Sequence, residues 1–312
     1  MLHSVKAFAP ATVANVSCGF DILGFAIDAM GDTVELVLKD EPGLVVVSIA
    51  GDGGKLPLDA EKNTCAVAIQ AMLDELKSNV GMNIYLTKGL PLGSGMGSSA
   101  ASAVAALAAA NRLLGEPFEK KDLLPFAIAA EKVACGAGHA DNVAPSLLGG
   151  FVLIRDYHPL DVIKLPVPSG LCCTLVHPHF ELKTADSRSV LRDQIPMKHA
   201  TIQSGNVAGL IAGLYEEDFE LISRSLRDVI AEPYRAVLLP GFYEVREALK
   251  AAGALGMGIS GSGPTLFALS KGKETAIAIA KAAEEIYREI GLGVDVYFSE
   301  INTKGAYVIE EK

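Results

Sequence analysis

The segment at residues 91–101, PLGSGMGSSAA, most constrains what this chain can fold into. It follows a predicted strand at residues 82–86 and opens an alanine-rich predicted helix at residues 100–114. Three alternating glycines let the backbone approach a ligand without Cβ atoms in the way. The unpaired N–H groups of the helix's first turn, together with the helix dipole, favour an anion there. We therefore expect a phosphate-binding loop made of Pro91, Leu92, Gly93, Ser94, Gly95, Met96, Gly97, Ser98, Ser99, Ala100 and Ala101.

The loop does not match the Walker A pattern, because no Gly-Lys-Ser/Thr follows it. Phosphates bound there would need Mg²⁺ and groups from elsewhere in the chain to neutralise them. The hydroxyls of Ser98 and Ser99 can bond a phosphate oxygen or a metal ion. Taken alone, the segment also fits a glycine-rich turn that caps a buried helix, so other segments must decide between the two interpretations.

The length and net charge of the chain indicate how many domains it has and which partners it can bind. The 312 residues are enough for two domains, and a formal net charge of −10 argues against a nucleic-acid partner, which would need a basic face. The N-terminus lacks the features of a signal peptide and no apolar run reaches transmembrane length, so we expect a cytoplasmic protein with no membrane partner. The five cysteines form no C-x-x-C pair, which is typical of reduced thiols.

The apolar pattern predicts two α+β units rather than a regular βαβ alternation. A stretch with prolines and a glycine at residues 165–170 marks the expected boundary, which divides the chain into domains at residues 1–167 and 168–312. Predicted strands occupy residues 34–38, 44–49, 82–86, 150–155, 171–176, 264–269 and 294–301. Predicted helices occupy residues 64–76, 100–114, 121–135, 241–252 and 274–290, and others begin near Ser187, Gly205 and Asp218.

Three segments together resemble the GHMP kinases, a superfamily that includes galactokinase, homoserine kinase and mevalonate kinase. Residues 91–101 resemble its nucleotide-binding motif, residues 9–21 its first motif and residues 258–265 its third, in the same order and spacing over essentially the whole chain. The resemblance implies an ATP-dependent kinase. It also implies an N-terminal domain like the second domain of ribosomal protein S5 and a ferredoxin-like C-terminal domain. In the nucleotide site it adds Gly261 and Ser262, with Asn63 and Lys88 as further candidates.

Within the superfamily, two further features resemble the homoserine kinases: GHADNVAP at residues 138–145 and N-x-x-x-G-F-D at residues 15–21. Ser17 and Cys18 depart from the Gly-Pro-like pair expected there. A pocket for homoserine, a zwitterion, needs an anion for the ammonium, planar cations for the carboxylate and a polar group near the hydroxyl. The resemblance implies that Asp21 binds the ammonium and that Arg188 and Arg235 bind the carboxylate. It also implies that Asn15, His139 and Asn142 line the pocket near the hydroxyl.

The resemblance also implies Mg²⁺ bound by Ser99 and Glu131. Glu131 lies in an apolar helical stretch where an unpaired carboxylate is costly to bury, although a surface pair with Lys132 is the alternative. Asn142 stands where some members have an aspartate base. We expect the hydroxyl to attack directly, oriented by Asn142, with Asp141 pointing elsewhere. Thr184 is a further candidate near the γ-phosphate.

Other features of the sequence allow different interpretations. Gly256-x-Gly258-x-x-Gly261 fits the dinucleotide fingerprint, but the predicted order of helix before and strand after is reversed. His177 and His179 share a strand face, yet no third metal ligand is evident. Two rival functions stay open, namely another GHMP kinase of the mevalonate-pathway type and a non-catalytic homologue that senses nucleotide or amino acid. The resemblance further implies a homodimer and a role in threonine biosynthesis.

Overall fold

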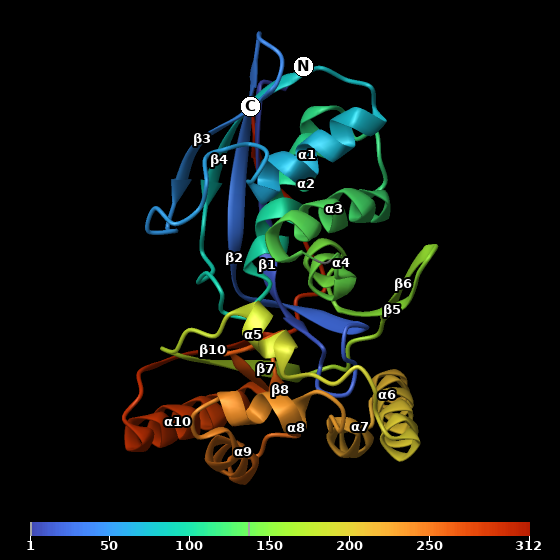
Figure 1. Cartoon of the computed structure of the whole chain (residues 1–312), viewed down its shortest axis with the longest axis vertical. Helices are drawn as coiled ribbons and strands as arrows, with labels where there is room; N and C mark the ends of the chain where they lie inside the picture. Colours follow the sequence, from blue (N-terminus) through green and yellow to red (C-terminus); the bar gives the residue numbers. More distant parts are fainter. Residues whose placement is uncertain (1, 137) are drawn as a thin grey trace.

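A computed structural model of the chain describes residues 2–136 and 138–312 (Figure 1). In this part of the chain the strands form two sheets, one of seven strands and one of four. The larger sheet occupies the upper half of Figure 1 and the smaller one the lower half, with both chain ends at the top. The two α+β units expected from the sequence are therefore present.

The larger sheet has the order β11-β1-β2-β4-β3, with β5 paired to β2 and β6 to β5. All its pairs are antiparallel except β3 with β4. Its strands are β1 (Ser4–Ala14), β2 (Leu23–Lys39), β3 (Leu44–Ala50), β4 (Gly81–Thr87), β5 (Phe151–Tyr157), β6 (Leu160–Leu165) and β11 (Tyr307–Glu311). The strand β2 is long enough to pair with β5 near its start and with β4 near its end.

Helices α1 (Thr64–Glu75), α2 (Ser98–Leu113), α3 (Leu124–Cys135) and α4 (Ala140–Leu148) cover one face of this sheet. The helix α2 contacts β1, β2 and the other three helices. Its buried residues are mostly alanines, whose small side chains let neighbouring backbones approach closely. Helix α2 is thus the centre of the N-terminal core, and three of its serines, Ser98, Ser99 and Ser102, line the cavity described below.

The smaller sheet has the order β10-β7-β9-β8, and all of its pairs are antiparallel. Its strands are β7 (Leu171–Pro178), β8 (Gly256–Ile259), β9 (Leu266–Lys271) and β10 (Val294–Glu300). Helix α10 (Lys273–Ile290) connects β9 to β10, and α9 (Phe242–Ala251) precedes β8. With helices between the first and second strands as well, this is the split β-α-β order of a ferredoxin-like unit. The predicted ferredoxin-like half is confirmed.

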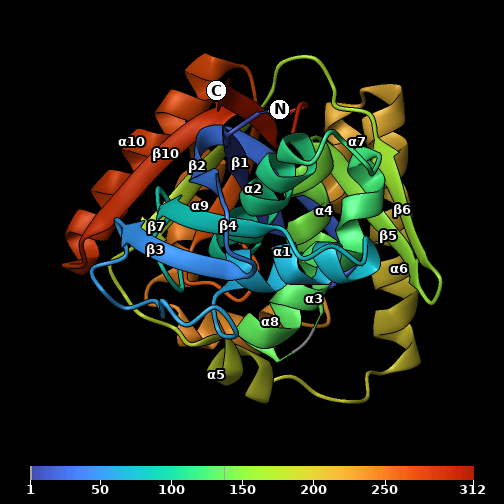
Figure 2. The ribbon, with the colours of Figure 1, turned by 90° about the horizontal axis from the view of Figure 1, so that it is seen from above.

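The remaining helices are α5 (Thr184–Ser189), α6 (Met197–Glu216), α7 (Phe219–Ser225) and α8 (Glu232–Arg235). Figure 2 shows the hairpin of β5 and β6 beside α6, and residues of β6 and α6 are in contact. Helix α5 lies between the two halves in Figure 1. The chain passes from one sheet to the other between β6 and β7, near the expected boundary at residues 167 and 168, but β11 returns to the first sheet.

Most predicted elements are confirmed within about two residues, whereas β1, β6, β8, β11, α4 and α8 were not anticipated. Two predicted starts are wrong: β2 begins at Leu23 rather than Val34, because its first residues pair with β1 and β5, and α6 begins at Met197 rather than near Gly205. Strand β1 contains Pro10 and four alanines, a composition that seldom forms strands, and it persists because it is buried between two neighbours. The strands β8 and β9 form a hairpin, so the glycines at 256, 258 and 261 do not open a helix as a dinucleotide loop would. Among the described residues, no helix is long and apolar enough to span a membrane.

Candidate active site

A cavity of about 490 Å³ lies where the phosphate loop, α3, the start of α4 and the loop after β8 meet. This volume is typical of pockets for small-molecule ligands. Its wall contains most of the residues that the sequence indicated, brought together from both halves of the chain. They are Asn15, Asp21, Asn63, Lys88, Leu92, Gly93, Ser94, Gly95, Gly97, Ser98, Ser99, Glu131, His139, Asn142, Thr184, Arg188, Arg235, Gly261 and Ser262.

Four residues of the predicted phosphate loop are not in the wall: Pro91, Met96, Ala100 and Ala101. The side chains of the last three are fully buried in the hydrophobic core. The prediction that the whole motif faces the site is therefore wrong at these four positions. Met96, Ala100 and Ala101 anchor the loop to the core, while Leu92 and the glycines and serines of the loop face the cavity.

The three loop glycines all have positive φ, from 65° to 81°, a conformation that disfavours other residues. The loop is braced by the third motif. Ser260 Oγ donates to the carbonyl of Gly95 at 2.7 Å, and the N–H of Thr265 donates to that of Ser94 at 3.2 Å. A Cβ on Gly95 would lie 2.5 Å from the Ser260 carbonyl oxygen, so the two motifs touch backbone to backbone.

The helix α2 begins directly after Gly97, with no side-chain cap on its first N–H groups. Its first turn is tied down from the other side by Lys88. The buried ammonium of Lys88 donates to the carboxylate of Asp32, to the carbonyl of Ser98 at 2.8 Å and to Ser102 Oγ at 2.8 Å. The free N–H groups of an uncapped helix start that faces a cavity favour an anion, and the bonds of Lys88 hold this start in place.

Lys88 and Asn63 line the cavity, but both side chains already have protein partners. The three donor hydrogens of Lys88 are matched by the three contacts just described. The Asn63 carboxamide caps α1 by accepting from the N–H of Cys65 at 3.0 Å, and it donates to the carbonyl of Pro57 at 3.0 Å. That Lys88 and Asn63 contact the nucleotide therefore stays a prediction. In the structure both side chains hold neighbouring backbone in place.

Asp21 and Arg188, both in the cavity wall, form an ion pair with Arg188 Nη2 3.0 Å from Asp21 Oδ1. The same guanidinium nitrogen lies 2.8 Å from His139 Nε2. Because Arg has no acceptor, His139 Nε2 must be the acceptor, and the imidazole is neutral with its proton on Nδ1. Burial lowers the pKa of His139, which agrees with a neutral ring beside a cation.

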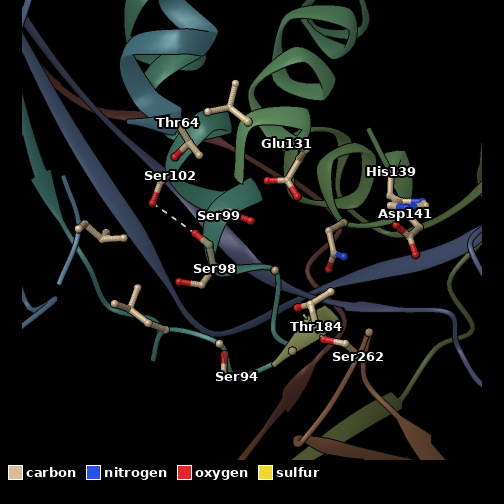
Figure 3. A pocket seen from close by; sticks show the side chains of 18 of the residues that line it. Thr64, Ser94, Ser98, Ser99, Ser102, Glu131, His139, Asp141, Thr184 and Ser262 are labelled. Carbon is tan, nitrogen blue, oxygen red and sulfur yellow. Dashed lines mark hydrogen bonds between the residues drawn. The ribbon is translucent and has the colours of Figure 1, made fainter. Parts of the chain in front are cut away.

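Arg235 is buried beside this pair. Its Nε donates to the carbonyl of Ser187 at 3.1 Å, its Nη1 to that of Gly261 at 3.0 Å, and its guanidinium lies over the ring of Phe20. Thr184, at the start of α5, lies 3.2 Å from the hydroxyl of Ser262 (Figure 3). The contacts of Arg235 with Gly261 and of Thr184 with Ser262 join these segments to the third motif, residues 258–265.

Asn15 is fully engaged with backbone groups. Its Nδ2 donates to the carbonyl of Gly261 at 2.8 Å, and its Oδ1 accepts from the N–H of Asp21 at 2.9 Å. The residues around it are strained, because Asn15, Val16, Ser17 and Asp21 all have positive φ. Such strain is typical of functional sites.

Asn142 lies in the first turn of α4, where its Oδ1 accepts from Thr12 Oγ1 at 2.7 Å. With Oδ1 engaged in this bond, Nδ2 is the donor left for the cavity. The prediction that Asp141 points elsewhere is wrong, since Asp141 also lines the cavity. Asp141 and Asn142 can both line the cavity because both lie in the first turn of α4, which begins at the cavity. Burial and the nearby charge of Asp21 raise the pKa of Asp141 to about 7.

Glu131 is buried on α3 and extends toward the start of α2, where Ser98 and Ser99 lie (Figure 3). Among residues 2–136 and 138–312, no three His, Cys, Asp or Glu side chains form a ready metal site. A carboxylate and a hydroxyl beside a phosphate site nevertheless fit Mg²⁺, which commonly binds one or two carboxylates together with substrate phosphates and water. His177 and His179 instead contact Thr265 and Asp295.

Sequence reasoning missed Thr12, Asp32, Ser102 and Asp141. Thr12 is within the first motif, and Asp141 is within the segment that resembles homoserine kinases, so both carried a signal. Asp32 and Ser102 carried none, because an aspartate in a strand and a serine in an alanine-rich helix are ordinary surface residues until the fold buries them together.

Two family models match the chain: "GHMP kinases N terminal domain" at residues 63–150 and "GHMP kinases C terminal" at residues 210–289. The curated homoserine kinase from Chlorobium phaeobacteroides is 52% identical over 99% of this chain and 100% of its own length. The chain belongs to the homoserine kinase family of the GHMP kinases. A more distant homoserine kinase, from Xylella fastidiosa, is 40% identical over 98% of this chain and 94% of its own.

Solved structures agree with this family assignment. The crystal structure of homoserine kinase from Cytophaga hutchinsonii matches with a TM-score of 0.97 and 56% identity, and covers 99% of this chain and 98% of its own. A mevalonate kinase from L. major shares the fold with a TM-score of 0.68 at 17% identity, covering 95% and 96% of the two chains. The two-domain GHMP fold is thus common to both families, while the sequence identity is shared with the homoserine kinases.

Proposed function

We propose that this protein transfers the γ-phosphoryl group of ATP to the hydroxyl of L-homoserine and forms O-phospho-L-homoserine for threonine biosynthesis. The observation that carries the proposal is the pair of Asp21 and Arg188 in one cavity with the phosphate loop. An α-amino acid bears an ammonium and a carboxylate on the same carbon. A pocket for it therefore needs an anion and a cation side by side, which this pair supplies.

The pair also argues against the rival acceptors. Mevalonate has a carboxylate but no ammonium, and galactose has neither charge, so neither acceptor offers Asp21 a cationic partner. Arg235, buried near Arg188, adds a second planar cation on the carboxylate side. A site for homoserine uses all three charges.

The phosphates of ATP would lie on the start of α2, where backbone N–H groups and the helix dipole favour them. Mg²⁺ would be held by Glu131 and the hydroxyl of Ser99, and when bound it neutralises charge on the transferred phosphoryl group. Lys88 supports this arrangement indirectly by fixing the first turn of α2.

Asn142 is the side chain we expect to orient the acceptor hydroxyl. With its Oδ1 held by Thr12, its Nδ2 can donate to the hydroxyl oxygen and leave the hydroxyl proton turned toward the phosphate. The phosphate itself or water then takes that proton, because an amide is a poor base. Positioning and charge neutralisation, rather than a strong base, supply the rate enhancement. We further propose a homodimer, as the resemblance implies, and a cytoplasmic location, as the pattern of cysteines indicates.

The test is ADP release with Mg²⁺ and ATP in the presence of L-homoserine, mevalonate, galactose or no acceptor. Release with homoserine alone, together with O-phosphohomoserine in the product, is the expected result. Release with mevalonate instead would keep the kinase and refute the acceptor. ATP binding without turnover with any acceptor would favour the non-catalytic homologue.

A further inference from the structure

The backbone of Asp21 is held in an unusual way. Its φ of +59° is uncommon for any residue other than glycine. Its N–H donates to Asn15 Oδ1, and its carbonyl accepts from the hydroxyl of Tyr157, each at 2.9 Å. Neither bond belongs to a helix or a strand, and a strained residue persists only where its surroundings hold it in place.

The hydroxyl of Tyr157 has a second partner. It accepts from the N–H of Ala140 at 3.3 Å, and Ala140 is the first residue of α4. This helix begins directly after His139 and carries Asp141 and Asn142 in its first turn. One oxygen at the end of β5 therefore joins the Asp21 loop to the helix that carries Asp141 and Asn142.

Tyr157 itself is not in the wall of the cavity. It is partly buried, and burial raises its pKa to about 12, so that the hydroxyl keeps the proton it donates. Any effect of this residue on the reaction must therefore pass through Asp21 and α4.

We propose that Tyr157 is a positioning residue that sets the Asp21 carboxylate relative to the start of α4 and so determines the affinity for the acceptor's ammonium group. The inference rests on the proposed function, because it assigns the ammonium to Asp21. Asn15 holds the other end of the Asp21 peptide, but it also bonds Gly261. Changing Tyr157 is the cleaner experiment, since it leaves the third motif untouched.

The test is Tyr157→Phe, which removes the hydroxyl and keeps the ring. We expect KM for homoserine to rise roughly five- to twentyfold, the effect of losing two hydrogen bonds. KM for ATP should stay within about twofold, because the start of α2 does not depend on Tyr157. Tyr287→Phe is the matched control, since Tyr287 is buried in the C-terminal core, and its kinetics should match the parent enzyme.

Two kinetic outcomes would overturn the proposal. One is an unchanged KM for homoserine in an otherwise active Tyr157→Phe enzyme. The other is a lowered melting temperature with both KM values unchanged, which would show an ordinary structural tyrosine. A crystal structure of the variant gives a readout independent of activity: we expect Asp21 to shift or to adopt more than one conformation. If the parent enzyme does not phosphorylate homoserine, the proposed function fails, and an unmoved Asp21 would separately refute the positioning role.

Discussion

At the scale of single residues, Asp141 makes a testable link between acceptor binding and protons. Burial and the charge of Asp21 raise the pKa of Asp141 to about 7. An ammonium that pairs with Asp21 would cancel part of that negative field and lower the pKa of Asp141. Binding should then release up to about half a proton per site near pH 7, and homoserine affinity should increase as the pH rises through 7.

Calorimetry of homoserine binding in buffers with different ionisation enthalpies measures this proton directly. Asp141→Asn is the control, because it keeps the size of the side chain and removes the titration. We expect the buffer dependence to disappear in that variant. Proton uptake by the parent enzyme, or equal buffer dependence in both proteins, would contradict the assignment.

At the scale of elements, the phosphate loop can be tested with two of its glycines. Gly93 and Gly97 have similar positive φ values, 65° and 69°. A Cβ on Gly93 would meet no atom within 4 Å, whereas one on Gly97 would lie 2.1 Å from Thr12 Oγ1 and 2.9 Å from Asn142 Oδ1. Gly93→Ala should cost only the conformational strain, about 1–2 kcal/mol, while Gly97→Ala should cost at least about 3 kcal/mol.

Urea unfolding of the free proteins compares the two variants without involving ligands. Gly97→Ala should also lower kcat, because the clash pushes Asn142 from its bond with Thr12. Equal losses of stability in the two variants would show that the loop relaxes freely, and that its contact with α4 does not constrain it.

At the scale of the whole molecule, β11 makes the N-terminal sheet depend on the end of the chain. It pairs with β1 from Val5 opposite Glu311 to Phe8 opposite Tyr307. Removing residues 306–312 would expose the edge of β1, which continues to Ala14 beside the active site. We expect the melting temperature to fall by more than about 5 °C, and the yield of soluble protein to drop.

Glu311→Ala is the control that distinguishes the loss of the β11 strand from the loss of its ion pair with Arg112. This change breaks only the exposed pair with Arg112, and surface pairs contribute about 0–1 kcal/mol. Its melting temperature should therefore stay close to that of the parent. A truncated protein that melts and turns over like the full chain would show that β11 is dispensable.

The sequence alone determined the features that depend on neighbours along the chain. A glycine loop between a strand and a helix is a local pattern, and so are the apolar periods that predicted α1, α2 and α10 and the split into two α+β units. The motifs also indicated which polar residues would line one cavity, and most of them do.

Only the tertiary structure decided how those side chains are used. Lys88 bonds Asp32 and Ser98 rather than standing free in the cavity, and β11 returns to a sheet that the chain had left long before. Tyr157, outside every motif, holds the backbone of Asp21. These contacts join residues far apart in sequence, and a side chain's partner is set by which strands and helices pack together. No local pattern encodes that packing, because hydrogen-bond geometry is satisfied only after the chain has folded.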